Sequence, residues 1–432
     1  MDARRWSFLM RTFLGNPLLK PIPGNRTGLP DNTRARTSAS PVPLILAILV
    51  ALTPAALYAG DREQAARMHS RLTGVPPTET VLQQMVTEID GGDPVAAAYI
   101  AMDDPAFYNV TVKNLAAPWT NEAMTPFVPL NDYTATVIGL VRDEADFRTV
   151  LYGNVLYIGD TGGLPAYDTD DNAHYEALEA SGADLGDSLQ RVTQSTYTSL
   201  PSQATAGVMT TRAAARAFFI DGTNRAMFRF TLMNHLCNDL EQVADVTLPV
   251  DRIRQDVSRS PGGDSRVFLN NCAGCHTGMD PMAQAFAYYD YEYDNNPELG
   301  ELVYNTTGMT DPDTGTRVQG KYLINATNFE HGYITRNDQW DNYWRMGDNR
   351  RLGWDGSLPG NGEGAKSLGR ELAHSDAFAQ CKVRQVFEQV CLRKPGDATD
   401  RSEIDSIVSS FRSSGFELKR AYAESAAYCM GE

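Results

Sequence analysis

Five consecutive residues near the middle of the chain carry the residue types needed for covalent attachment of haem. They read Cys272-Ala273-Gly274-Cys275-His276, the C-x-x-C-H motif. The two thiols can add across the vinyl groups of haem c, and the adjacent imidazole can then ligate the iron. The motif therefore predicts one covalent haem c, with Cys272 and Cys275 as attachment residues and His276 as the proximal iron ligand.

Two other chemistries use a pair of cysteines at this spacing. A thioredoxin-like dithiol needs the pair at the strand-to-helix turn of a βαβ unit, and the sequence lacks that alternation. A zinc site needs four ligands, and the sequence holds no second C-x-x-C and no H-x-x-x-H to complete the set. Both stay as alternatives, while haem c also explains the histidine directly after the second cysteine.

The distal iron ligand must come from sequence farther away, because residues shortly after His276 are still on the proximal side of the ring. This argument excludes Met279 and Met282. Met346 lies at about the downstream distance of the ligand in small single-haem cytochromes, so we expect it to be the distal ligand. A thioether ligand would raise the reduction potential. The other candidates are Met309, His331, His374, Met233 and His235.

A second set of oxygen ligands has the spacing of a calcium-binding loop. Its members would occupy positions one, three, five, nine and twelve, as Asp168, Asp170, Asn172, Glu176 and Glu179. Position six is Ala173, whereas the sharp turn of such a loop requires glycine. The residues from Asn172 onward also suit the acidic first turn of a helix, which we favour over calcium.

Residues 1–59 have the layout of a secretory leader. Arg34 and Arg36 precede an apolar run over 44–52, and a small residue suited to cleavage follows at Ala59. An uncleaved anchor is the alternative, because the run is close to the shortest that spans a bilayer. We therefore expect a periplasmic or secreted protein that associates with a membrane only if the leader is uncleaved. Export agrees with haem c, which is attached outside the cytoplasm.

The composition is that of a globular protein with an acidic surface. The 432 residues are 42% hydrophobic and 21% charged, enough to bury a sizeable core, and the formal net charge is -16. Such a charge argues against nucleic acid as a partner and would steer basic proteins toward the chain.

Four cysteines lie outside the motif, and they can form two disulfides in three ways: Cys237, Cys381, Cys391 and Cys429. The pattern over 377–392 predicts one continuous helix. Ten helical residues rise about 15 Å, too far for a disulfide, so this helix would exclude a bond between Cys381 and Cys391. Two pairings then remain.

Hydrophobic periodicity predicts a mainly α-helical protein with irregular loops. We divide the chain after the leader into an N-terminal helical region (60–205), a haem-binding region (206–370) and a C-terminal helical region (371–432). A loop is expected over 153–171, and a short hairpin in the irregular stretch that ends at 327. The expected helices cover 65–72, 81–89, 95–102, 135–151, 211–219 and 225–236.

Several segments resemble the single-haem cytochrome modules in large secreted proteins of planctomycetes and other bacteria, a family without an established function. The similar segments follow the same order, at 67–77, 206–211, 224–225, 236–237, 272–281 and 378–383. Ala283 and the stretch 285–289 depart from the family pattern. The resemblance implies a mainly helical cytochrome and pairing of Cys237 with Cys381, which leaves Cys391 to pair with Cys429.

These observations predict an exported monohaem c-type cytochrome that transfers single electrons to or from a redox protein. One alternative is a haem-dependent enzyme, such as a peroxidase or oxygenase, with an open distal face. Another is a binding module in which the haem is structural.

Overall fold

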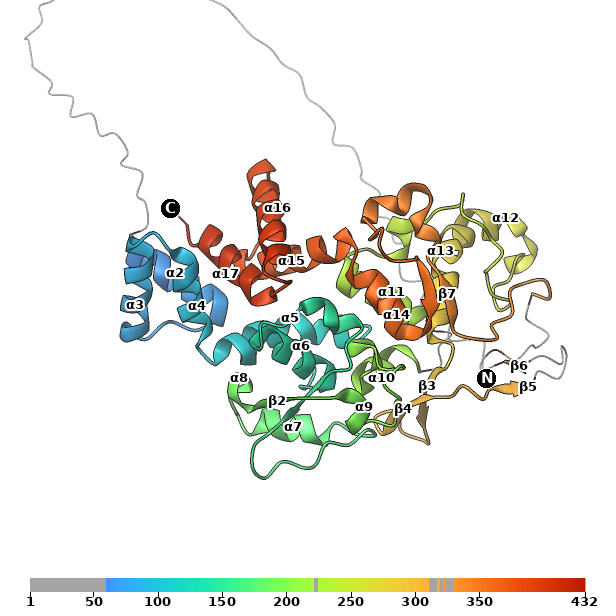
Figure 1. Ribbon diagram of the computed structural model, residues 1–432, viewed down its shortest axis with the longest axis horizontal. Helices are drawn as coiled ribbons and strands as arrows, with labels where there is room; N and C mark the ends of the chain where they lie inside the picture. Colours follow the sequence, from blue (N-terminus) through green and yellow to red (C-terminus); the bar gives the residue numbers. More distant parts are fainter. Residues whose placement is uncertain (1–59, 221–223, 311–316, 319–321, 323–328, 432) are drawn as a thin grey trace, which may run out of the picture. The chain divides into compact units, whose positions relative to one another are not determined.

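The computed structural model describes residues 60–431 except 221–223, 311–316, 319–321 and 323–328 (Figure 1). The leader predicted over 1–59 lies outside the described residues. Among the residues that are described, no helix is both long and apolar enough to cross a bilayer. These residues belong to one compact unit.

Helices make up most of the structure, which confirms the prediction of a mainly α protein. The helices before the motif are α2 (Asp61–Thr73), α3 (Glu79–Asp90), α4 (Pro94–Met102), α5 (Lys113–Ala116), α6 (Asp132–Arg142), α7 (Ala173–Ala180), α8 (Leu185–Ser188), α9 (Gln194–Tyr197), α10 (Arg212–Phe218) and α11 (Arg225–Leu236). The later helices are α12 (Ser265–Val267), α13 (Ala273–Ala283), α14 (Gly364–Ala373), α15 (Asp376–Cys391), α16 (Ala398–Ser413) and α17 (Leu418–Cys429).

Short helices of other types connect these elements. The π-helices are η1 (Phe107–Val112) and η7 (Phe268–Cys272). The 3₁₀ turns are η2 (Ala117–Thr120), η3 (Phe147–Leu151), η4 (Gly207–Thr210), η5 (Leu240–Val243), η6 (Pro261–Gly263), η8 (Gln284–Phe286), η10 (Tyr343–Arg345) and η11 (Gly347–Leu352).

The strands form two-stranded antiparallel sheets. The pairs are β1 (Leu156–Gly159) with β2 (Leu189–Val192), β3 (Tyr289–Tyr293) with β4 (Gly300–Tyr304), β5 (Met309–Thr310) with β6 (Arg317–Val318), and β7 (Gln339–Asp341) with β8 (Asn361–Glu363). The β5–β6 pair is the short hairpin expected in the irregular stretch.

Local sequence signals set many of the helix ends. Gly74 ends α2 in the left-handed conformation at φ 78°, which glycine adopts without steric cost. Thr78 caps α3 by accepting a hydrogen bond from the Val81 amide, and Thr211 caps α10 in the same way. The predicted helices over 65–72, 81–89, 95–102, 211–219 and 225–236 are confirmed within a few residues.

One expectation about the first half of the chain is wrong, and another holds in part, because residues 160–171 contain neither helix nor strand, as expected. The helix expected over 135–151 breaks after Arg142, because Glu144 has φ 47° and Asp146 starts η3 by accepting from the Arg148 amide. The loop expected over 153–171 contains β1, which pairs with a strand some thirty residues later. A pairing between segments so far apart leaves no signal in either segment alone.

Helix α15 holds the C-terminal half of the core together. It packs against α16 and α17 on one side and against α11 on another, while α11 also packs against α13. One contiguous apolar core runs from Ala65 in α2 to Cys429 in α17. The motif helix α13 is therefore anchored through α11 to the main core.

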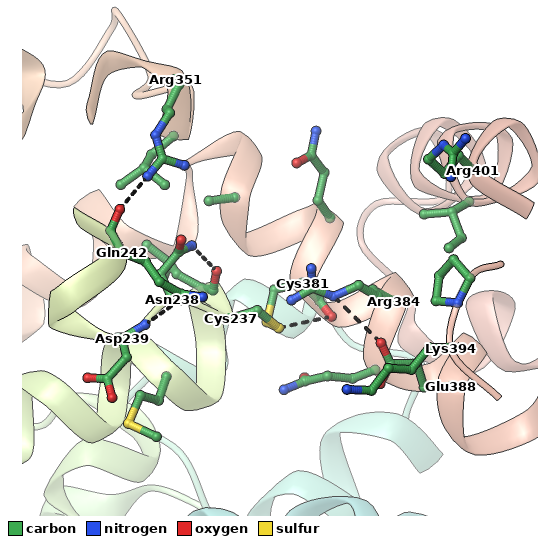
Figure 2. Close-up of a pocket in the computed structure, with 18 of the residues that line it drawn as sticks. Cys237, Asn238, Asp239, Gln242, Arg351, Cys381, Arg384, Glu388, Lys394 and Arg401 are labelled. Atoms are coloured by element: carbon green, nitrogen blue, oxygen red, sulfur yellow. Dashed lines mark hydrogen bonds and ion pairs between the residues drawn. A yellow bond between two sulfur atoms is a disulfide. The ribbon is translucent and has the colours of Figure 1, made fainter. Parts of the chain in front are cut away.

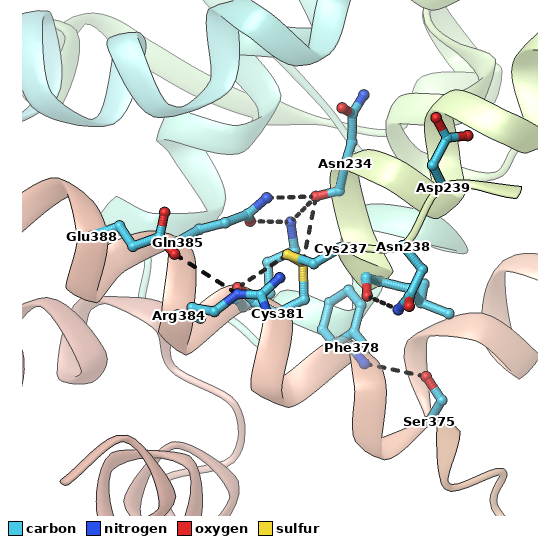
Figure 3. The surroundings of a disulfide bond; sticks show 12 residues. Asn234, Cys237, Asn238, Asp239, Ser375, Phe378, Cys381, Arg384, Gln385 and Glu388 are labelled. Carbon is cyan, nitrogen blue, oxygen red and sulfur yellow. Dashed lines mark hydrogen bonds and ion pairs between the residues drawn. A yellow bond between two sulfur atoms is a disulfide. The ribbon is translucent and has the colours of Figure 1, made fainter. Parts of the chain in front are cut away.

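Two disulfides fix the ends of these helices. Cys237, directly after α11, is bonded to Cys381 in α15 (Figure 3). Cys391 at the end of α15 is bonded to Cys429. This is the pairing that the family resemblance implied. Helix α15 is continuous from Asp376 to Cys391, as expected, so its two cysteines bond to different partners.

A buried lysine lies beside the first disulfide. Nζ of Lys382 donates to the Asn234 carbonyl at 2.8 Å and to Gln385 Oε1 at 2.9 Å, and it lies 3.8 Å from the Trp119 ring centroid. Its side chain is fully buried, and burial lowers the pKa of Lys382 well below its usual value.

We predict that Lys382→Met removes part of the pH dependence of stability. Between the lowered folded-state pKa of Lys382 and the usual lysine pKa, the unfolded chain binds a proton that the folded protein does not. In that window folded stability rises with pH by up to about 1.4 kcal/mol per unit. The variant loses this slope, and the Asn234 carbonyl keeps its bond from Gln385 at 3.0 Å. Urea unfolding between pH 6 and 9 measures the slope, with Lys394→Met as an exposed control. Equal slopes in wild type and Lys382→Met would refute the assignment.

Candidate functional site

The predicted haem-attachment residues lie at the junction of two helix types. Cys272 is the last residue of the π-helix η7, and Cys275 and His276 lie in the first turn of α13. Residues three and four positions apart share one helix face, so the two sulfurs and the imidazole lie on the same side. Single-turn π segments inside α-helices are frequent at functional sites.

The two motif cysteines differ from the others in the structure. Cys272 and Cys275 are free and half-buried, whereas the other four are bonded in pairs. Cys272 packs against a small cluster that contains Ile253 and Phe268, and the Cys275 thiol donates to the Leu240 carbonyl at 3.5 Å. Two half-buried sulfurs without a sulfur partner fit attachment residues.

The surroundings of Cys275 do not suit a redox dithiol. Burial raises the pKa of its thiol, and the nearby carboxylates Glu241 and Asp239 raise it further, whereas reactive dithiols have a lowered pKa. The motif follows a π-helix, and the sheets within the described ranges are antiparallel pairs without a βαβ unit. The described ranges also contain no group of three His, Cys, Asp or Glu side chains that could hold a metal ion, and a zinc site would require such a group.

The imidazole of His276 is held by a buried carboxylate. Its Nδ1 lies 3.0 Å from Oδ1 of Asp280, one helical turn further along α13. The His276 side chain is 19% exposed and that of Asp280 is fully buried. Burial alone would raise the pKa of Asp280, but Arg225 and His276 outweigh it and hold that pKa well below its usual value. The ionised carboxylate accepts, so Nδ1 carries the proton and Nε2 keeps its lone pair for a metal.

Arg225 at the start of α11 anchors this carboxylate. Its Nε donates to Asp280 Oδ1 at 2.8 Å and its Nη2 to Asp280 Oδ2 at 3.0 Å. The same guanidinium donates two hydrogen bonds to Asp256, at 2.9 and 2.8 Å. Arg254 contributes its backbone amide to Asp280 Oδ2 at 3.1 Å, and its guanidinium lies 3.4 Å from Asp256. Four charged side chains thus support one imidazole.

The opposite face of α13 packs tightly on other parts of the 206–370 region. Gly274 accepts from the Asp245 amide at 2.9 Å and lies against the 244–246 segment, and Gly278 lies against the Trp344 ring. Both glycines are two residues from His276, about 200° around the helix. The segment that carries Trp344 is therefore on the side of α13 turned away from the imidazole.

Met346 belongs to that segment. It follows Trp344 by two residues, is 48% exposed, and precedes Gly347, which approaches Asp245. Met346 therefore lies with the segment that packs on the Gly278 side of α13, and its role as distal ligand stays a prediction.

The other candidate distal ligands are spread over the structure. His235 is buried and its Nε2 is engaged by the Tyr133 hydroxyl at 2.8 Å. Met309 is exposed in β5, Met233 lies on α11, and His374 follows α14. Exposed His331 lies in a segment whose Tyr333 exchanges backbone hydrogen bonds with residues 253 and 255, beside the cluster that contacts Cys272.

The calcium-like spacing does not form a site. Residues from Ala173 onward form α7, as the alternative reading expected. Asp168 Oδ1 accepts from the Thr169 and Asp170 amides, and Glu179 binds Lys113 and the Leu130 amide. These carboxylates serve the local backbone and a surface ion pair.

A groove of about 1030 Å³ is lined in part by η5, the short helix that also contacts the Cys275 thiol. Cys237 and Cys381 form part of its wall, with Arg384 on α15 and Arg401 on α16 (Figure 2). Short helix η5 contributes Gln242 to the groove, while its Leu240 carbonyl receives the Cys275 thiol. The motif residues themselves do not line it.

Sequence reasoning missed the supporting charges of the site. Asp280 is four residues after His276, and this spacing places two side chains next to each other on a helix. The spacing alone could have identified Asp280 as a partner of His276. Arg225 and Asp256 carry no such signal, because their contact with Asp280 depends on how α11 packs against α13.

No protein-family model, curated protein or solved structure matches this chain. The assignment of the site therefore rests on the chain's own residues.

We predict that Gly278→Ala destabilises the site region. An added Cβ would overlap the indole of Trp344, which is fully buried and cannot move away freely. Overpacking of this kind costs about 1–3 kcal/mol. Thermal unfolding measures the loss, and Gly356→Ala is the matched control because open space surrounds that position. Equal unfolding temperatures for the two variants would show that α13 does not pack in this way.

Proposed function

We propose that this protein is an exported monohaem c-type cytochrome that transfers single electrons to or from a redox protein. The observation that carries the proposal is the pairing of His276 with buried Asp280 beside two free, half-buried thiols on one helix face. Histidines that ligate metals usually donate their other ring N–H to a carboxylate or carbonyl, which fixes the tautomer. The residues present therefore fit the group that the motif calls for.

Each residue has a distinct task in this proposal. Cys272 and Cys275 would each form a carbon–sulfur bond to a vinyl group, and each thiol proton would go to the other vinyl carbon. His276 would present Nε2 to the iron while Asp280 holds the proton on Nδ1. The haem supplies the one-electron ferric–ferrous couple, and the chain supplies attachment, orientation and electrostatics.

The remaining parts of the proposal concern location and partner. The leader supports export to the periplasm or beyond, where both disulfides are stable. The net charge of -16 supports a basic redox protein as partner and argues against nucleic acid.

A haem-dependent enzyme with an open distal face is the second candidate function. The position of Met346 favours an open distal face. Met346 belongs to the segment of Trp344, which packs on the side of α13 turned away from His276. Electron transfer instead requires a sixth ligand that keeps small molecules off the iron.

We predict that Cys272→Ala/Cys275→Ala abolishes covalent haem. Protein expressed with a haem c maturation system should gain the mass of one haem in wild type and none in the double variant. Denaturing mass spectrometry and haem staining of gels provide the measurement. Cys391→Ser/Cys429→Ser, which removes two bonded cysteines, should keep the haem. Covalent haem in the motif variant would place the attachment elsewhere.

A second prediction separates the two candidate functions. If the iron has a tight sixth ligand, added cyanide leaves the ferric spectrum unchanged; if the distal face is open, cyanide shifts it. The electron-transfer proposal expects an unchanged spectrum. Met346→Ala, measured in parallel, should open the iron to cyanide if Met346 is the ligand and have no effect if it is not.

A further inference from the structure

Asp280 has more contacts than a simple acceptor for an imidazole needs. Its Oδ1 accepts from His276 Nδ1 at 3.0 Å and from Arg225 Nε at 2.8 Å. Its Oδ2 accepts from Arg225 Nη2 at 3.0 Å and from the Arg254 amide at 3.1 Å. Donors on both oxygens fix the plane of the carboxylate, so the direction in which it accepts from the imidazole is fixed too.

Asp280 lies in a cluster of charged side chains, and its hydrogen bond to the imidazole is part of that cluster. Arg225 and Arg254 face Asp256 and Asp280, and Arg259 is close enough to interact electrostatically with both carboxylates. An imidazole that would bind iron through Nε2 carries its proton on Nδ1, so it meets the fully buried, Arg225-paired carboxylate as a donor. A charge-assisted hydrogen bond in a buried site is stronger than one in water.

From this geometry we infer that Asp280 is a positioning residue that sets the orientation and donor strength of His276 toward the haem iron. The inference rests on the proposed function. An N–H donated to a carboxylate increases the basicity of the opposite ring nitrogen. A more basic Nε2 stabilises ferric iron more than ferrous iron, so Asp280 holds the reduction potential lower than His276 alone would give.

The chain offers a matched control for this role. Asp256 and Asp280 both bind Arg225, and replacing either by Asn removes one negative charge from the same cluster. Of the two, Asp280 is the one that contacts the imidazole. A difference between the two variants therefore reports the hydrogen bond to His276 beyond the change in charge.

The experiment compares wild type, Asp280→Asn and Asp256→Asn, each as the full haem-loaded chain. Midpoint potentials come from spectroelectrochemical titration, and the ligand field at the iron from the EPR g values of the ferric protein. We expect Asp280→Asn to raise the midpoint potential by at least twice as much as Asp256→Asn does. We also expect Asp280→Asn to change the g values and Asp256→Asn to leave them unchanged. Equal potential shifts with unchanged g values would overturn the inference.

A measurement on wild type covers the case in which Asp280→Asn fails to fold. In ferrous protein labelled with ¹⁵N-histidine, the Nδ1 proton of His276 should give a downfield NMR signal that exchanges slowly with solvent, because its acceptor is a buried anion. A rapidly exchanging proton at an ordinary shift overturns the role of Asp280. Wild type without covalent haem overturns the proposed function as well, so the two failures are distinguishable.

Discussion

A buried carboxylate held between a guanidinium and an imidazole is the interaction on which the candidate site depends. Asp280 could not remain ionised in the interior without Arg225, because desolvation alone raises the pKa of a buried carboxyl. With Arg225 in place it holds the Nδ1 proton of His276, which leaves the other ring nitrogen for a metal. The thiols of Cys272 and Cys275 lie on the same face, so one helix presents every residue that haem attachment requires.

The rest of the fold places that helix. Helix α11 delivers Arg225 at its first residue and packs against both α13 and α15, and the Cys237–Cys381 disulfide ties its end to α15. Because the Gly274–Gly278 side of α13 is packed against Trp344 and its neighbours, the cysteine and histidine side is the one left for a ligand. Scaffold and site are therefore linked through α11.

Local signals explain why much of this was predictable. Short stretches of sequence are enough to predict three features: the C-x-x-C-H motif, the helices with a clear cap such as Thr78, and the continuous helix that separates Cys381 from Cys391. What was missed depends on long-range packing: the β1–β2 pairing, the break after Arg142, and the contact of Arg225 with Asp280. The placement of Met346 also follows from long-range packing, that of Trp344 on Gly278, and its role as distal ligand stays a prediction.

The central claim is that one haem is bound covalently to this chain, and the pyridine haemochrome spectrum of the purified protein tests it most directly. The full chain should be produced with a haem c maturation system and its haem content compared with its protein content. The account predicts the spectrum of haem c at one haem per chain, retained after denaturation. A colourless protein whose mass equals that of the bare polypeptide would contradict it.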